Sequence, residues 1–133
     1  MSNENNVIIQ VTDLEKHFKQ GKIKALNGIS VDINKGDVMV VIGPSGSGKS
    51  TFLRCLNLLE VPTGGQIVFD GVDITDKSND INVHRQKMGM VFQHFNLFPH
   101  MNIMDNMTLA PVNLKKMTKA EAEEKAMQLL ERV

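Results

Sequence analysis

The segment GPSGSGKS, residues 43–50, decides the fold that this sequence predicts. It matches the phosphate-binding pattern G-x-x-x-x-G-K-[ST] at every fixed position. An apolar run, residues 38–42, stands directly before it, and a predicted helix, residues 50–59, follows. A strand, a glycine-rich loop and a helix in this order are the setting that the pattern requires, so we expect a nucleoside-triphosphate site.

The chemistry of triphosphates explains this arrangement. Several backbone N–H groups must converge on the phosphate oxygens, and glycines at 43, 46 and 48 permit the necessary backbone angles and close contact. The partial positive end of the following helix adds to the attraction. Lys49 is expected to contact the β- and γ-phosphates, and the Ser50 hydroxyl is expected to bind Mg²⁺. The pattern alone indicates a P-loop NTPase and does not separate kinases, GTPases and transporters.

Alternating and apolar runs predict the strands. Residues 29–33 alternate strictly between apolar and polar side chains, and residues 7–11 alternate weakly. Residues 66–70 are predicted to form a further short strand. Residues 38–42 and 88–92 are apolar on both faces, as is typical of strands buried in a parallel sheet. We therefore expect an α/β fold with a parallel sheet that is preceded by antiparallel strands.

Three further segments are candidate helices. Residues 76–85 are polar and are expected to form a short helix or a loop. Residues 103–109 are expected to be helical until Pro111 interrupts them. The clearest helix follows Thr118, because Thr118 and Glu121 match the capping box that satisfies exposed N–H groups at a helix start.

The composition excludes several classes of protein. Lys and Arg number 15, as do Asp and Glu, so no nucleic-acid partner is expected from bulk charge. No apolar run approaches the roughly 20 residues of a membrane span, and the N-terminus lacks the pattern of a signal peptide. The single cysteine, Cys55, lies in an apolar stretch and is expected to be a small buried hydrophobe. The four histidines show no metal-ligand spacing.

Three segments beyond the phosphate loop resemble the ATP-binding cassette (ABC) ATPases. After the loop, the sequence FLRCLNLLEVPTGGQIVFDG at residues 52–71 is similar to that family's leucine-rich helix and P-T-x-G turn. The segment MGMVFQ at residues 88–93 looks like the strand that leads to its Q-loop. The segment LFPHMNIMDN at residues 97–106 is similar to the stretch with which ABC importers contact their membrane subunits. With TLAP at residues 108–111, the resemblance is closest to the branch that takes up polar amino acids.

This resemblance implies roles for individual residues. Gln93 would be the Q-loop glutamine. Lys49 and Gln93 would be the catalytic residues, and Ser50 and Gln93 would be the Mg²⁺ ligands. Phe18 lies where the family places an aromatic ring that stacks on adenine, and it lacks the hydroxyl of the more usual tyrosine. The ATP-binding residues would be Phe18, Gly43, Pro44, Ser45, Gly46, Ser47, Gly48, Lys49, Ser50 and Thr51.

The resemblance also implies an architecture and partners. The fold would be a P-loop NTPase of the ABC ATPase type with an N-terminal antiparallel β part and an incomplete sheet. Residues 1–101 would form a partial nucleotide-binding core, and residues 102–133 would begin a helical subdomain. ATP and Mg²⁺ would be the cofactors, and a second copy of the ATPase subunit would be a partner. Transmembrane permease subunits would bind Phe98, Pro99, His100 and Met101.

The resemblance also implies that an extracytoplasmic amino-acid-binding protein is an indirect partner of the subunit. The subunit itself would lie peripherally on the cytoplasmic face of the cell membrane. The family's LSGGQ-type signature, the strand that ends in Asp before a catalytic Glu, and the switch His have no counterpart in residues 1–133. We therefore expect the N-terminal portion of an amino-acid importer ATPase, inactive in hydrolysis by itself. The alternatives are an ABC ATPase of the lipoprotein-release or cell-division branch, against which FPH and LAP argue, and a nucleotide-binding module that never hydrolyses ATP.

Overall fold

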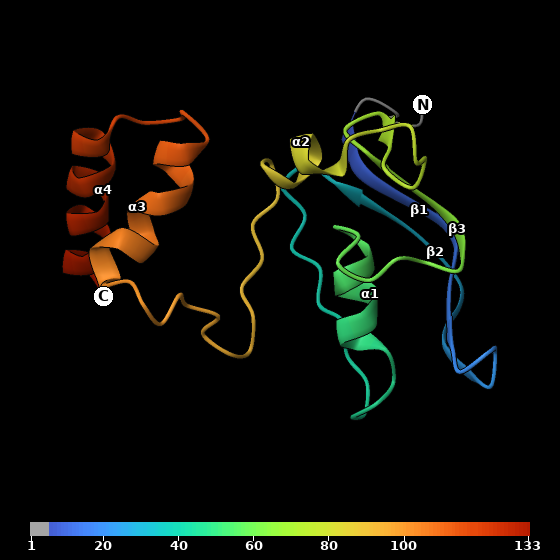
Figure 1. The fold of residues 1–133 in the computed structure, drawn as a ribbon. Coiled ribbons are helices and arrows are strands. Elements are labelled where there is room, and N and C mark those ends of the chain that lie inside the picture. Colours follow the sequence, from blue (N-terminus) through green and yellow to red (C-terminus); the bar gives the residue numbers. More distant parts are fainter. Residues whose placement is uncertain (1–5) are drawn as a thin grey trace. The chain divides into compact units, whose positions relative to one another are not determined.

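The computed structural model describes residues 6–133, whose helices and strands are drawn in Figure 1. They divide into two compact units, Met1–Gly89 and Met90–Val133, and each unit is described by itself. The first unit contains the sheet, the phosphate loop and two short helices. The second contains two longer helices.

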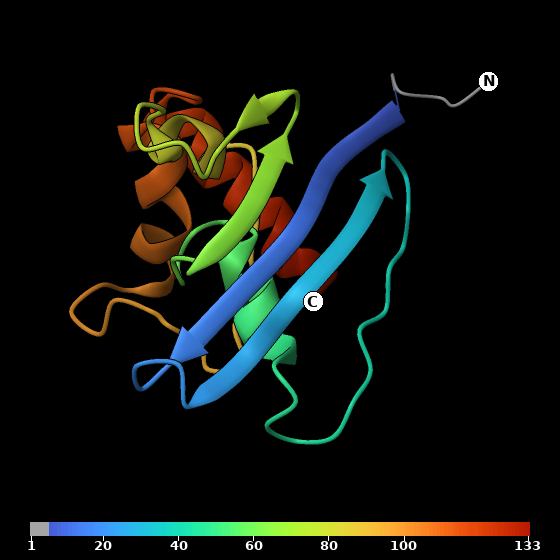
Figure 2. The same cartoon turned by 90° about the vertical axis from the view of Figure 1, so that its right-hand side faces the viewer.

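The sheet has four antiparallel strands in the order β2-β1-β3-β4. Their bounds are Val7–Phe18 for β1, Ile23–Asn34 for β2, Gly64–Phe69 for β3 and Val72–Asp73 for β4. The strands predicted near residues 7–11, 29–33 and 66–70 are confirmed, but β1 and β2 extend well beyond them. Figure 2 shows these two long strands side by side, with β3 on the other side of β1.

Helix α1, Lys49–Cys55, packs on one face of the sheet through Phe52 and Cys55. The buried core consists of Val11, Leu14, Leu26, Phe52, Cys55, Ile67, Phe69 and Ile74. The helix ends before the predicted residue 59, because Leu58 has a φ of 55°, which an α-helix does not accommodate. Cys55 is 0% exposed, which confirms that it is a buried hydrophobe. Desolvation, with a smaller contribution from Glu60 and an opposing one from Lys16, raises the pKa of its thiol to about 11.

The two predicted parallel strands are wrong for this chain. Residues 38–42 form no strand, and the exposed fractions of Val38, Val40 and Ile42 are 93%, 76% and 87%. Residues 88–92 also lie outside any strand, and Val91 is 99% exposed. A strand that is apolar on both faces is stable only between hydrogen-bonded neighbours and covering helices. Within residues 6–133, every strand of the sheet is antiparallel and none pairs with either segment.

The second helix of the first unit is shorter than α1. Within the polar stretch 76–85, the structure forms α2, Ile81–Arg85, whose N-cap Asp80 accepts a hydrogen bond from the Asn82 N–H. The Arg85 guanidinium donates to the carbonyls of Asn57 and Leu58 at 2.9 and 3.1 Å. These bonds hold α2 against the segment that follows α1.

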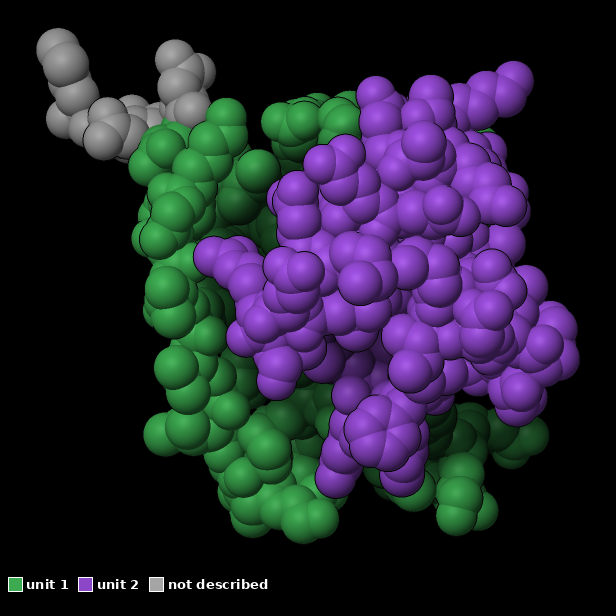
Figure 3. Space-filling view, turned by 90° about the vertical axis from the view of Figure 1, so that its left-hand side faces the viewer, with its two compact units in different colours: residues 1–89 green, residues 90–133 purple. Residues whose placement is uncertain are grey.

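The second unit pairs α3, Ile103–Asn113, with α4, Lys119–Arg132; Figure 3 colours the two units separately. The capping box at Thr118 and Glu121 is confirmed. The prediction that Pro111 interrupts the preceding helix is wrong, since α3 continues to Asn113. Pro111 lacks only one N–H donor, and its own carbonyl accepts bonds from Lys116 and Met117 at the end of the helix.

Candidate functional site

The phosphate loop, residues 43–50, rests against the backbone of β2. Gly48 is the N-cap of α1 and has a φ of 97°, in the left-handed region that favours glycine. A Cβ added to Gly48 would lie 2.5 Å from the Ala25 carbonyl oxygen, which is backbone and has little freedom to move. Gly46 also has a positive φ, of 78°, but a Cβ there would meet no atom within 4 Å. Position 48 therefore needs glycine for both its positive φ and its close approach to β2, whereas position 46 needs glycine for its positive φ alone.

The Lys49 ammonium lies inside the loop. Its Nζ donates hydrogen bonds to the carbonyls of Gly43 and Pro44 at 2.6 and 2.7 Å and to Ser47 Oγ at 3.4 Å. A Cβ at Gly43 would come within 2.7 Å of that same Ser47 Oγ. The loop thus concentrates a positive charge where backbone donors are also available, which suits a phosphate oxygen.

Ser50 and Thr51 follow Lys49 in the first turn of α1. Ser50 is exposed, and its hydroxyl makes no hydrogen bond among the contacts described for residues 6–133. A free hydroxyl at this position suits Mg²⁺, which takes few protein oxygens and completes its shell with phosphate and water. No group of three or more His, Cys, Asp and Glu side chains in the described residues could hold a metal by itself.

A cavity of about 420 Å³ lies beside the loop. It is lined by residues from β2, the segment 39–42, the phosphate loop and α1, namely Leu26, Ile29, Val31, Met39, Val41, Ile42, Gly43, Pro44, Ser47, Gly48, Lys49 and Phe52. Lys49 supplies the only charge in this lining, which contains no carboxylate. A group that would orient an attacking water is therefore not provided by these walls.

Phe18 is the last residue of β1 and is half-buried. It pairs with Ile23 of β2, two residues before Ala25, the residue whose carbonyl approaches Gly48. Two residues along a strand span about 7 Å. The structure therefore brings the proposed base-stacking ring and the phosphate loop to the same end of the β1–β2 hairpin.

Gln93 and the segment of Phe98 belong to the second unit, whereas Lys49 belongs to the first. Gln93 is exposed. The backbone of Phe98 is fixed by Asn106, whose side chain accepts from its N–H at 2.8 Å and donates to its carbonyl at 3.2 Å. The Phe98 and His100 rings meet edge to face with centroids 6.0 Å apart.

This part of the second unit has a small groove of about 200 Å³. Its lining consists of Leu97, Phe98, Pro99, Met101, Ile103, Asn106 and Met107. The side chain of Phe98 is 49% exposed. An exposed aromatic ring on a backbone that is held in place by hydrogen bonds is a feature typical of contact surfaces.

Sequence reasoning missed two residues that shape these sites. Asn106 fixes the Phe98 loop from eight positions away, and Lys16 places its Nζ 5.0 Å from the centroid of the Phe18 ring. The only sequence signal for Asn106 was its place in the segment 97–106, and Lys16 had none. No helix in the described residues combines the length and the apolar character that crossing a membrane demands.

The sequence profile of the ABC transporter family matches residues 26–133, which is most of the chain. The chain belongs to the ABC transporter family. Its ABC relatives include the arginine transport ATP-binding protein ArtM of Bacillus subtilis, 54% identical over 127 residues, with 95% of this chain and 52% of the relative covered. They also include the glutamate/aspartate import ATP-binding protein GltL of Escherichia coli, 50% identical over 113 residues, covering 85% and 47%. The chain spans about half the length of the curated relatives it matches.

Solved ABC structures resemble the fold closely. The dimeric ATP-binding cassette MJ0796 bound to ADP and Pi has a TM-score of 0.80 at 31% identity, and the match covers 93% of this chain and 56% of that one. The protein cbiO1 from Clostridium perfringens, part of the ABC transporter complex cbiONQ, has a TM-score of 0.75 at 29% identity, covering 96% and 50%. The predicted fold class, an ABC-type P-loop NTPase with an N-terminal antiparallel sheet, is confirmed.

Proposed function

We propose that this chain is part of the ATP-binding subunit of an amino-acid ABC importer and that it binds MgATP at residues 43–51. The observation that carries the proposal is the phosphate loop itself. Its Lys49 ammonium lies among loop oxygens, and its Gly48 fits against β2 where no other residue would. The printed names of the relatives support the amino-acid branch, since they transport arginine or glutamate and aspartate.

Each site residue has a proposed role. Lys49 attracts the β- and γ-phosphates, and the backbone N–H groups of residues 46–51 bind their oxygens. The Ser50 hydroxyl and the Gln93 amide oxygen are the proposed protein ligands of Mg²⁺, which neutralises charge on the phosphates when bound. Gln93 also orients water near the phosphate. Phe18 stacks on adenine.

The proposed partners follow from the family and from the second unit. A second copy of the subunit completes the nucleotide site, as the dimeric form of MJ0796 suggests by analogy. Phe98, Pro99, His100 and Met101 contact the transmembrane permease subunits, supported by the exposed Phe98 ring beside an apolar groove. The subunit then lies on the cytoplasmic face of the membrane, and an extracytoplasmic amino-acid-binding protein acts on it only through the permease.

Titration with MgATP tests the nucleotide site. Lys49→Ala removes a charge-assisted contact of about 1.5–3 kcal/mol, so we expect affinity to fall by about tenfold or more. Lys35→Ala, at an exposed turn in the same unit, is the matched control and is expected to bind normally. Equal affinity of the Lys49 variant and the unaltered chain would refute the site.

Co-purification tests the permease contact. In the complete subunit, Phe98→Asp places a charge beside the apolar groove and is expected to abolish assembly with the membrane subunits, while MgATP binding remains. Phe95→Asp is the control, because Phe95 is 93% exposed in the same segment and does not line the groove. The proposal fails if the Phe98 variant assembles as well as the Phe95 variant.

A further inference from the structure

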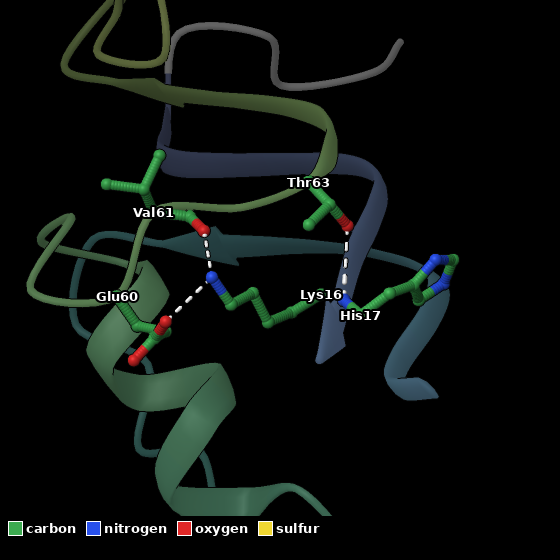
Figure 4. Close-up of polar contacts among 5 residues, drawn as sticks. All are labelled: Lys16, His17, Glu60, Val61 and Thr63. Carbon is green, nitrogen blue, oxygen red and sulfur yellow. Dashed lines mark hydrogen bonds and ion pairs between the residues drawn. The ribbon is translucent and has the colours of Figure 1, made fainter. Parts of the chain in front are cut away.

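Lys16 lies in β1, two residues before Phe18, and has no role in the site described so far. Its side chain is only 13% exposed. Its Nζ lies 2.7 Å from Glu60 Oε1 and donates to the Val61 carbonyl at 2.7 Å (Figure 4). The same Nζ lies over the Phe18 ring, 5.0 Å from its centroid. A lysine ammonium is buried this far only when partners replace its water, and here a carboxylate, a carbonyl and a ring do so.

The partners of Lys16 connect the Phe18 strand to the phosphate-loop helix. Glu60 and Val61 lie between α1 and β3, and the Glu60 N–H donates to the Arg54 carbonyl at 3.1 Å, inside α1. Beside them, Thr63 Oγ1 accepts from the His17 N–H at 3.1 Å, as Figure 4 shows. Since α1 begins at Lys49, one chain of contacts runs from the proposed base site to the proposed phosphate site.

We propose that Lys16 is a positioning residue that holds the Phe18 ring in place for the nucleotide base. The inference rests on the proposed binding of MgATP and on Phe18 stacking. The ammonium covers one face of the ring and attracts its π-electrons, so the ring cannot turn away and the base stacks on the uncovered face. Glu60 and Val61 keep the ammonium at that position.

The rival explanation is that Lys16 only fastens β1 to residues 60–63. Inorganic tripolyphosphate separates the two, because it carries the phosphates of ATP but no base. If Lys16 positions the ring, its loss weakens MgATP and leaves magnesium tripolyphosphate unchanged. If it only supports the fold around α1, both ligands weaken together.

The experiment titrates both ligands into the chain and its variants. We expect Lys16→Met to lower MgATP affinity about threefold to tenfold, the scale of a partly desolvated cation–π contact, without affecting tripolyphosphate. Lys16→Arg retains the cation and is expected to bind both ligands normally. Lys22→Met, an exposed lysine in the same hairpin, is the matched control. In a Phe18→Ala background, which itself loses MgATP affinity, Lys16→Met is expected to cause no further loss.

Glu60→Gln is a second variant, in case Lys16→Met fails to fold. It keeps a hydrogen-bond acceptor but removes the charge that holds Lys16, so we expect a smaller loss that again affects MgATP only. Equal loss of both ligands, no loss of MgATP, or an undiminished effect of Lys16→Met without Phe18 would each overturn the positioning role. Failure of the unaltered chain to bind either ligand would instead remove the proposed function, on which this inference depends.

Discussion

Gly48 and Gly46 differ in one respect that an experiment can measure. Both have a positive φ, but only Gly48 faces a backbone atom, the Ala25 carbonyl oxygen, at a distance that excludes a Cβ. Gly46→Ala is therefore expected to cost about 1–2 kcal/mol of folding free energy from backbone strain alone. Gly48→Ala is expected to cost clearly more and to abolish MgATP binding, because the loop must move away from β2. Urea unfolding and MgATP titration measure both effects.

The two glycine variants serve as each other's control. If Gly48→Ala and Gly46→Ala destabilise the chain equally, the contact with Ala25 has no energetic weight. In that case the position of the loop against β2 is not what requires glycine at 48.

Single residues were predictable where a local pattern imposes their chemistry. The glycines, Lys49 and Ser50 belong to one contiguous motif, so spacing alone is enough to propose them as site residues. Lys16 and Glu60 are 44 positions apart, and only the folded sheet brings them together. No periodicity reports a contact of that kind, which is why the support of Phe18 became visible only in the structure.

At the scale of elements, α4 provides a stability test that is independent of the nucleotide site. Thr118 Oγ1 accepts from the Glu121 N–H at 3.3 Å, and the Thr118 N–H donates back to Glu121 Oε2 at 2.9 Å. Thr118→Ala removes the cap and is expected to destabilise α4 by about 1 kcal/mol. Amide hydrogen exchange in the first turn of α4 measures this. Unchanged protection there would mean that the cap contributes nothing.

The same cap predicts a dependence on pH. The Thr118 N–H, and then its hydroxyl, favour the carboxylate form and lower the pKa of Glu121 from 4.5. A lowered pKa gives stability that is fully present above the ordinary value and is lost as pH falls through the folded one. Protection of the first turn of α4 is therefore expected to fall below about pH 4.5. Glu121→Gln, which still fits a capping box, is expected to remove this dependence.

Elements were predictable in proportion to how local their stabilisation is. The cap at Thr118 acts within four residues, so sequence sufficed for α4. Residues 38–42 have a clear strand composition, but a strand also needs a neighbour, and composition cannot supply one. The length of β1 was underestimated for a different reason. Asp13 has a φ of 46° and lies at a register shift, so the alternation of side chains is interrupted there although the strand continues to Phe18.

For the whole molecule, residues 38–42 predict self-association. Val38 and Val40 are 93% and 76% exposed, whereas Met39 and Val41 line the cavity beside the loop. An extended apolar segment with unpaired backbone groups is a template for another chain. We expect light scattering to show mass that rises with concentration, and Val40→Lys to reduce it without changing MgATP affinity. The control is Val83→Lys in α2, at a side chain that is 52% exposed.

Association of this kind fails as an explanation under either of two results. A constant monomer mass at every concentration would show that the exposed segment attracts no second copy. Equal association of the Val40 and Val83 variants would show that the contact lies elsewhere in the chain.

Because Cys55 is buried between α1 and the sheet, the reactivity of its thiol can be used to measure how often the first unit opens. The chain has one cysteine, so an alkylating reagent that reacts only with thiolate can label only one position. With a pKa of about 11, the closed unit holds about one thiolate in a thousand at pH 8, whereas a thiol with the ordinary pKa of 9.0 in an opened chain holds about one in ten. Labelling therefore proceeds almost entirely through molecules in which α1 has left the sheet. The labelling rate therefore measures how often α1 separates from the sheet beneath the phosphate loop. A ligand that binds only the closed form is expected to slow the labelling, and a tighter ligand is expected to slow it more.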